Sequence, residues 1–126
     1  MTVLGLDIGG ANLKAATTDG RAWSKPFALW REPGRVAEIV EAAGQVDEVR
    51  VTMTGELCDC YETKRQGVGQ IVDAVEQAAS GRAVLVWSTA GRFIAPTEAK
   101  ANPMAVAAAN WHALATALAP RTAPDR

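Results

Sequence analysis

A short cluster of residues near the N-terminus has the types and spacing needed to bind a phosphate group. Asp7 lies near the end of an apolar run, and Gly9 and Gly10 follow it, so a polyanion can approach the backbone closely. A carboxylate repels phosphate unless a cation lies between them, and Mg²⁺ is the natural candidate because it takes few carboxylate ligands. Asn12 and Lys14 point to one side of a strand by alternation, and either can reach a phosphate oxygen. We therefore predict Asp7 as a metal ligand and the other four as cofactor-binding residues; the alternative is an ordinary hairpin with a solvated aspartate.

A second polar stretch, residues 54–65, follows a β-branched run farther along the chain. Glu56 and Asp59 are three residues apart, so one helical turn would place both carboxylates on the same side. They are candidates for metal ligation or for a general base. Lys64 and its neighbour Arg65 are candidates for binding phosphate. The alternative is a solvated polar loop without a chemical role.

The two cysteines, Cys58 and Cys60, are only one residue apart. Neighbours this close are poor partners for an unstrained disulfide, so free thiols are expected. Two thiols supply at most half of a zinc site. The single histidine, His112, is far along the chain and is expected at the surface.

The elements that position these residues begin with an antiparallel meander of three strands, expected over 3–8, 11–18 and 21–30. Gly9-Gly10 and Asp19-Gly20 predict two-residue hairpin turns, which need positive φ. Pro26 lacks an N–H donor and predicts that the third strand lies at a sheet edge.

Helical and strand patterns alternate in the remainder of the chain. They predict helices over 36–43, 68–79 and 102–119 and strands over 48–53 and 83–87. Pro120 is expected to end the third helix. Its apolar stripe contains Met104, Trp111, Leu114 and Leu118. The predicted class is α/β, with a five-stranded mixed sheet of order 3-2-1-4-5 and flanking helices. In this order the strand order reverses between the first and fourth strands, where Gly9-Gly10 and residues 54–59 are predicted to face one another.

Composition limits the classes of partner. The chain has 126 residues, 48% of them hydrophobic, which suits one globular domain. A net charge of −1 gives no field to attract nucleic acid. The N-terminus shows no secretory pattern, and no apolar run reaches the length of a membrane span. These features favour a cytoplasmic protein that binds neither nucleic acid nor membrane.

Residues 4–14 and 52–64, together with 102–111, resemble one family. The Asp-x-Gly-Gly hairpin and the element order resemble the ribonuclease H-like half-domain of the actin and sugar-kinase superfamily. Within it, the chain is similar to the tetrahydromethanopterin-linked one-carbon transfer pathway proteins, relatives of hydantoinases and oxoprolinases. That group includes the methanofuran-biosynthesis enzyme that joins an aminomethylfuran diphosphate to γ-glutamyltyramine and releases diphosphate. The resemblance implies catalytic roles for Asp7, Glu56, Asp59 and Lys64.

Members of this family contain two such domains with a cleft between them. The resemblance therefore implies a phosphate-binding domain over residues 1–119 and a flexible tail or linker over 120–126. A second domain, or a second copy in a homodimer, would complete the cleft. We expect the chain alone to fold but to have little activity, because half of the cleft is missing.

Three functions remain open at this stage. The first is the N-terminal domain of a transferase in C1-carrier cofactor biosynthesis that binds a phosphate or diphosphate ester with Mg²⁺. The second is the half-domain of an ATP-dependent, sugar-kinase-like enzyme or ATPase. The third is a non-catalytic module that associates with itself through an exposed cleft face.

Overall fold

The computed structural model describes residues 1–26, 28–57 and 60–122, and the remaining positions lie outside this description. Within the described part, one sheet of six strands has the order β3-β2-β1-β4-β5-β6. The strands are β1 (Val3–Ile8), β2 (Asn12–Thr17), β3 (Ala22–Pro26), β4 (Glu48–Met53), β5 (Ala83–Trp87) and β6 (Phe93–Ile94). The helices are α1 (Val36–Ala43), α2 (Lys64–Ala79), α3 (Pro96–Ala101) and α4 (Asn110–Thr122), with 3₁₀ turns η1 (Pro33–Arg35), η2 (Gly55–Leu57) and η3 (Pro103–Ala105).

The order of the first five strands agrees with the prediction, and the fold class is α/β as expected. β1 lies at the centre, antiparallel to β2 and parallel to β4, and β5 continues the parallel part. The predicted total of five strands is wrong, because β6 pairs antiparallel with β5. The chain turns back after β5 through Gly91, whose φ is 82°. The sequence indicates a short extended piece over 92–95, but a strand of two residues has too short a hydrophobic period to be counted as part of the sheet.

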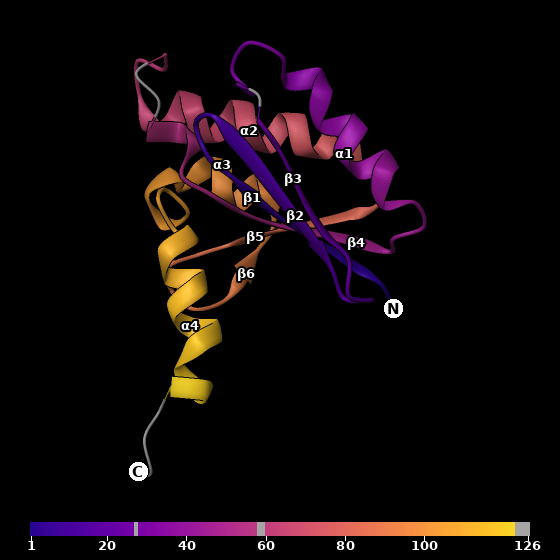
Figure 1. Ribbon diagram of the computed structural model, residues 1–126. Coiled ribbons are helices and arrows are strands. Elements are labelled where there is room, and N and C mark those ends of the chain that lie inside the picture. Colours follow the sequence, from indigo (N-terminus) through magenta and orange to yellow (C-terminus); the bar gives the residue numbers. More distant parts are fainter. Residues whose placement is uncertain (27, 58–59, 123–126) are drawn as a thin grey trace.

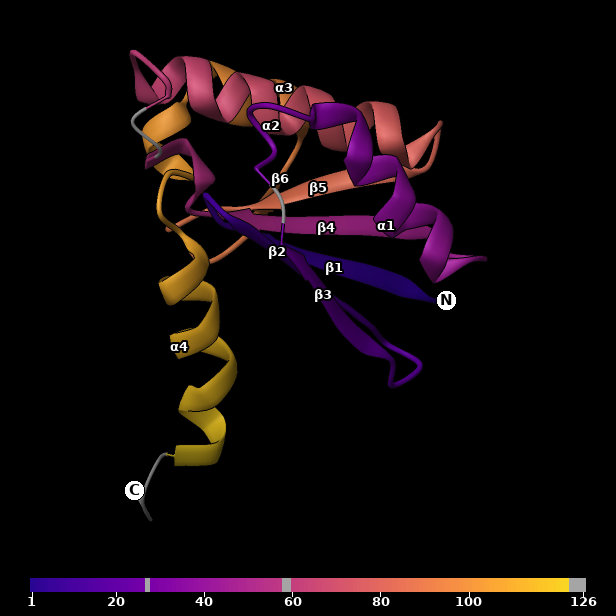
Figure 2. The same cartoon turned by 45° about the horizontal axis from the view of Figure 1, so that its top comes forward.

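Helices α1, α2 and α3 cover one face of the sheet, whereas α4 extends away on the opposite side (Figures 1 and 2). Strand alternation explains this asymmetry, because Leu4, Leu6 and Ile8 of β1 point into the covered face and are buried. The residues between them on β1, among them Asp7, point to the other face and remain partly exposed. The hydrophobic core therefore lies between the sheet and the first three helices.

Both predicted hairpins form, but neither turn has the predicted geometry. The first connection is centred on Gly10 and Ala11, because Gly9 N–H donates to Asn12 O over 2.9 Å. Neither Gly9 nor Gly10 has a positive φ, so the expected backbone conformation is wrong. The second connection has three residues, with Gly20 at a φ of 97° as the left-handed position. Pro26 ends β3 at the sheet edge, as predicted.

The predicted third helix over residues 102–119 is wrong. The chain forms α3 earlier, at Pro96, and then η3, and a left-handed residue, Ala108 with φ 51°, separates η3 from α4. A side chain at positive φ is disfavoured, so no propensity scale predicts a break at an alanine. The predicted end at Pro120 is also wrong, because α4 continues to Thr122. Proline inside a helix removes one backbone hydrogen bond but need not end the helix.

The apolar stripe expected on that helix does not face the core. The exposed fractions of Met104, Trp111, Leu114 and Leu118 are 65%, 63%, 61% and 40%. Met104 lies on η3, before the break at Ala108, and the break directs α4, with Trp111, Leu114 and Leu118, away from the core. No helix of the described part of the chain is both long and apolar enough to span a bilayer.

Candidate functional site

A small hollow of about 150 Å³ opens where β1, β4 and the start of α4 meet. Its lining residues are Asp7, Gly9, Gly10, Ala11, Asn12, Lys14, Thr54 and Asn110. All five residues predicted from the N-terminal cluster therefore line one cavity. Asp7 and Lys14 are direct partners across β1 and β2, so their side chains leave the same face of the sheet.

Asp7 is the only carboxylate among the described residues that line this hollow. Its Oδ1 atom is buried and has no hydrogen-bond partner in the described structure. Burial raises the pKa of the Asp7 carboxyl, while the neighbouring Lys14 and Asn110 side chains act in the opposite direction. A buried carboxylate oxygen without a partner is costly, and either a proton or a cation would satisfy it. The residues present therefore fit a divalent cation held by Asp7, directly or through water.

Close backbone packing joins the two strand ends that the sequence predicted to be neighbours. Thr54 N–H donates to Ile8 O over 2.9 Å. A Cβ on Gly55 would lie 3.1 Å from Gly9 O, so only glycine fits there without displacement. A Cβ on Gly10, in contrast, would meet nothing within 4 Å. Because Gly10 has neither a positive φ nor a close neighbour, nothing inside the chain requires glycine at this position.

Asn110 is a lining residue that the sequence analysis missed. It begins α4, and its Nδ2 lies 3.5 Å from Thr54 Oγ1, at the limit of a hydrogen bond. Its Oδ1 accepts from Trp111 N–H at 2.8 Å. The missed signal was the preference of asparagine for helix starts, which the assumption of one continuous helix concealed.

Glu56 occupies a different place from Asp7, although the two are near in the fold. Its side chain is only 2% exposed, and it does not line the hollow. One carboxylate oxygen accepts a hydrogen bond from Ala108 N–H, and the other is buried without a partner. Burial raises the pKa of Glu56, partly offset by backbone hydrogen bonds and Lys64. This position suits a structural anchor, and the predicted catalytic role stays a prediction.

The remaining predicted site residues lie beside Glu56 or outside the description. Lys64 is the first residue of α2 and lies close enough to influence the Glu56 charge. Asp59 and Cys58 are outside the described residues. Cys60 is disulfide-bonded, so the expectation of a free thiol there is wrong. No cluster of three metal-ligating side chains occurs within the described residues.

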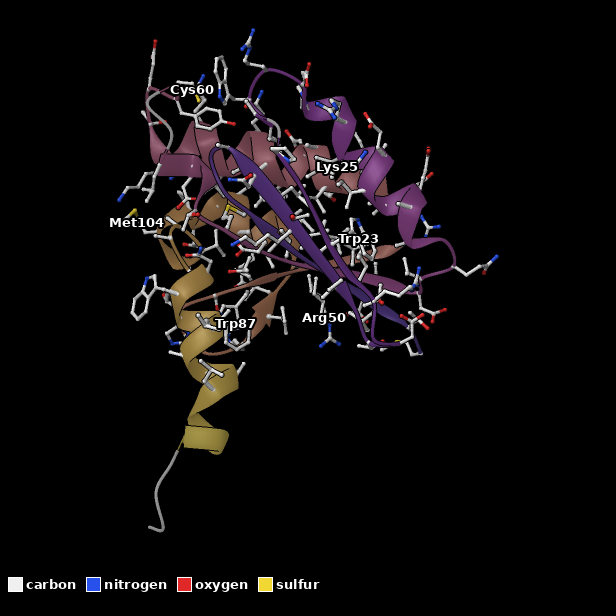
Figure 3. The ribbon with its side chains drawn as sticks, viewed as in Figure 1. Trp23, Lys25, Arg50, Cys60, Trp87 and Met104 are labelled. Carbon is white, nitrogen blue, oxygen red and sulfur yellow. The ribbon has the colours of Figure 1, made fainter. Side chains whose placement is uncertain are left out.

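His112 is half-buried rather than a surface residue, which corrects the prediction. Its Nδ1 accepts a hydrogen bond from Trp87 Nε1 over 3.1 Å. Figure 3 shows Trp87 beside α4, on the face of the sheet opposite α1 and α2. The bond fixes α4 against β5, and α4 in turn places Asn110 at the hollow.

Comparison with known proteins identifies the family of the chain. The chain belongs to the hydantoinase/oxoprolinase family, whose model matches residues 47–124. It is also similar to the (4-{4-[2-(gamma-L-glutamylamino)ethyl]phenoxymethyl}furan-2-yl)methanamine synthase of Methanocaldococcus jannaschii, with 38% identity over 117 residues. The match covers 90% of this chain but only 35% of that synthase, so the chain spans about a third of the length of this relative.

Proposed function

We propose that this chain is the phosphate-binding part of a transferase in methanofuran biosynthesis, built on the ribonuclease H-like half-domain of actin-like proteins. The name of the similar synthase describes a furan joined to a phenol oxygen through a methylene group. An ether of this kind forms when a phenol oxygen attacks a furan methylene that carries a leaving group. Diphosphate is the leaving group that suits a glycine hairpin beside a carboxylate and a lysine.

The observation that carries this proposal is the buried, unpartnered Oδ1 of Asp7 at the hollow. Asp7 would hold Mg²⁺, and the ion would supply charge neutralisation for the departing diphosphate. Gly10 and the backbone of the hairpin allow the phosphate oxygens to approach, and Lys14 adds a positive charge from the neighbouring strand. Asn12 and Asn110 can donate hydrogen bonds that orient the phosphate.

The proposed step balances as a substitution at carbon. The bond between the phenol oxygen and the furan methylene forms, the bond between that methylene and the diphosphate oxygen breaks, and the phenol proton passes to a base. Glu56 is poorly placed as this base because its oxygens are buried outside the hollow. Asp59 stays the proposed base, and Lys64 a proposed partner for the leaving group.

A binding experiment on the chain tests the proposal. Mg²⁺ and inorganic diphosphate are added to the ¹⁵N-labelled protein, and the amide signals of Gly9, Gly10 and Asn12 are followed by NMR. We expect shifts that require both additives, and we expect Asp7→Asn to lose these Mg²⁺-dependent shifts. Stronger binding of ATP than of diphosphate would favour the kinase or ATPase alternative, and no shift at the hairpin with either ligand would refute the phosphate site.

A glycine pair provides the matched control. Gly10→Ala adds a methyl group in open space at the hollow, and Gly34→Ala adds one in open space on η1, remote from it. Both variants should fold like the parent. Only Gly10→Ala should weaken diphosphate binding, by about tenfold, or about 1.4 kcal/mol.

Self-association is a second candidate function, favoured by the exposed Met104, Trp111 and Leu114 side chains. Sedimentation velocity over a range of concentrations tests it. A mass that rises with concentration and falls back in Trp111→Ser would support it, whereas a constant monomer mass would exclude it.

A further inference from the structure

A larger groove of about 630 Å³ separates α4 from the sheet face that α1 and α2 leave uncovered. Its floor crosses the sheet from β2 to β6, and its roof is the inner side of α4. Small residues make it deep: Gly5 and Ala16 are cross-strand partners in the floor, and Ala113 and Ala117 face them from α4. The small side chains on the sheet and on α4 therefore leave the space that forms the groove.

The groove and the phosphate hollow share a border. Asp7, Lys14 and Asn110 line both cavities. A molecule lying in the groove would therefore place one end beside a diphosphate bound at the hairpin. This continuity is what the proposed substitution requires, because the attacking oxygen must reach the carbon that carries the leaving group.

The far part of the groove is aromatic and carries one cation. Trp87 and Phe93 meet edge to face with ring centroids 4.9 Å apart. The Arg50 guanidinium carbon lies 4.8 Å from the centre of the Phe93 ring. Arg50 contacts Glu48 through Nε at 2.7 Å, and its terminal amino groups make no other hydrogen bond or ion pair within the described residues. Aromatic side chains can stack against a flat ring, and a guanidinium can bind a carboxylate through charge-assisted hydrogen bonds.

We propose that this groove binds the acceptor substrate, a phenol whose tail carries a carboxylate. The phenol oxygen would lie at the Asp7 end, the ring against Trp87 and Phe93, and the tail carboxylate at Arg50. The inference rests on the proposed transferase function, since it assigns the second substrate of that same site. The proposal adds a place on this chain for the acceptor and a residue, Arg50, that selects for the tail carboxylate.

Two phenols that differ in their tails probe the groove. γ-Glutamyltyramine ends in an α-amino acid, with a carboxylate and an ammonium group, and N-acetyltyramine carries neither. The chain is titrated with each, and the Trp87 indole N–H and the Ala113 amide signals are followed by NMR. We expect both to shift these signals, with tighter binding of the carboxylate compound. Arg50→Gln should remove most of that preference while leaving the affinity for N-acetyltyramine within about twofold.

A pair of tryptophan substitutions on α4 separates groove binding from contact with the outside of the helix. Both alanines are exposed, but only Ala117 lines the groove. Ala117→Trp fills the cavity and should weaken binding of both phenols at least tenfold. Ala115→Trp places the same side chain two residues earlier on α4, outside the groove, and should leave both affinities unchanged.

Diphosphate binding in the same variants separates the two proposals. Ala117→Trp should still bind Mg²⁺ and diphosphate at Gly9 and Gly10. If diphosphate binds but neither phenol shifts Trp87 or Ala113, or if Ala117→Trp binds phenols like the parent, the acceptor groove is overturned and the phosphate site survives. If the phenols bind and diphosphate does not, the phosphate site fails while the groove stands as a phenol site.

Discussion

The carboxylate of Glu56 accepts a hydrogen bond from the backbone N–H of Ala108, 52 residues farther along the chain. Ala108 has a φ of 51°, the left-handed conformation that turns the chain from η3 into α4. Glu56 follows β4, and α4 carries Asn110 to the hollow. One hydrogen bond therefore connects the end of a central strand to the element that completes the candidate site.

We expect Glu56→Ala to destabilise the protein by about 1–3 kcal/mol, because it leaves the partly buried Ala108 N–H without an acceptor. Glu56→Gln keeps an oxygen acceptor and should retain most of the stability. Urea denaturation measures both variants. Equal loss in the two would show that the charge of Glu56, rather than its hydrogen bond, is what the structure needs.

A glycine in α2 makes room for this anchor. A Cβ on Gly67 would lie 2.8 Å from Glu56 Cα and 2.9 Å from Tyr61 Cδ2. We expect Gly67→Ala to cost about 1–3 kcal/mol through overpacking. The matched change in the same helix is Gly69→Ala, which meets nothing within 4 Å and should stabilise by up to about 1 kcal/mol. Thermal unfolding of both variants is the measurement, and an unchanged midpoint in Gly67→Ala would contradict the packing described here.

The bond from Trp87 to His112 should hold α4 against the sheet. Trp87→Phe removes the donor but keeps an aromatic ring, so α4 should open more often. We expect the free energy of opening, measured by hydrogen exchange of the α4 amides, to fall by about 0.5–1.5 kcal/mol. Trp111→Phe is the control, because Trp111 is 63% exposed. Identical exchange of the α4 amides in the two variants would mean that the bond contributes nothing to docking.

Stability should fall as pH rises above about 5, where ordinary carboxyl groups are ionised. Burial raises the pKa of both Asp7 and Glu56. A raised folded-state pKa gives stability that is complete below the unfolded-state value and is lost as pH rises through the folded-state value. Asp7→Asn should flatten this decline and make the variant more stable than the parent at pH 7. Urea unfolding at several pH values checks the slope, and a parent whose stability rises from pH 5 to 7 would disprove it.

Mg²⁺ should reverse part of this pH effect if Asp7 holds the ion. The cation binds the ionised carboxylate, so it should raise the unfolding free energy at pH 7 more than at pH 5. Asp7→Asn should lose the response, whereas Asp73→Asn, on the surface of α2, should keep it. The same Mg²⁺ stabilisation in all three proteins would indicate an unspecific salt effect.

The sequence by itself determined the central part of the fold. Four elements have the predicted bounds, because each carries a local period of apolar residues long enough to recognise. They are the strands Val3–Ile8, Glu48–Met53 and Ala83–Trp87 and the helix Val36–Ala43. The sheet order followed from hairpin and crossover rules. The gathering of the Asp7 and Gly9-Gly10 cluster in one hollow followed from strand alternation and the place of the turn.

Only the tertiary structure decided the course of the chain after β5. Ala108 turns at positive φ because the distant carboxylate of Glu56 satisfies its N–H, and no local signal in an alanine-rich run encodes that contact. The same long-range bond made Glu56 a buried anchor, brought Asn110 to the hollow, and left the groove open beneath α4. Contacts between residues far apart in sequence fix these features, so they become visible only when the chain is folded.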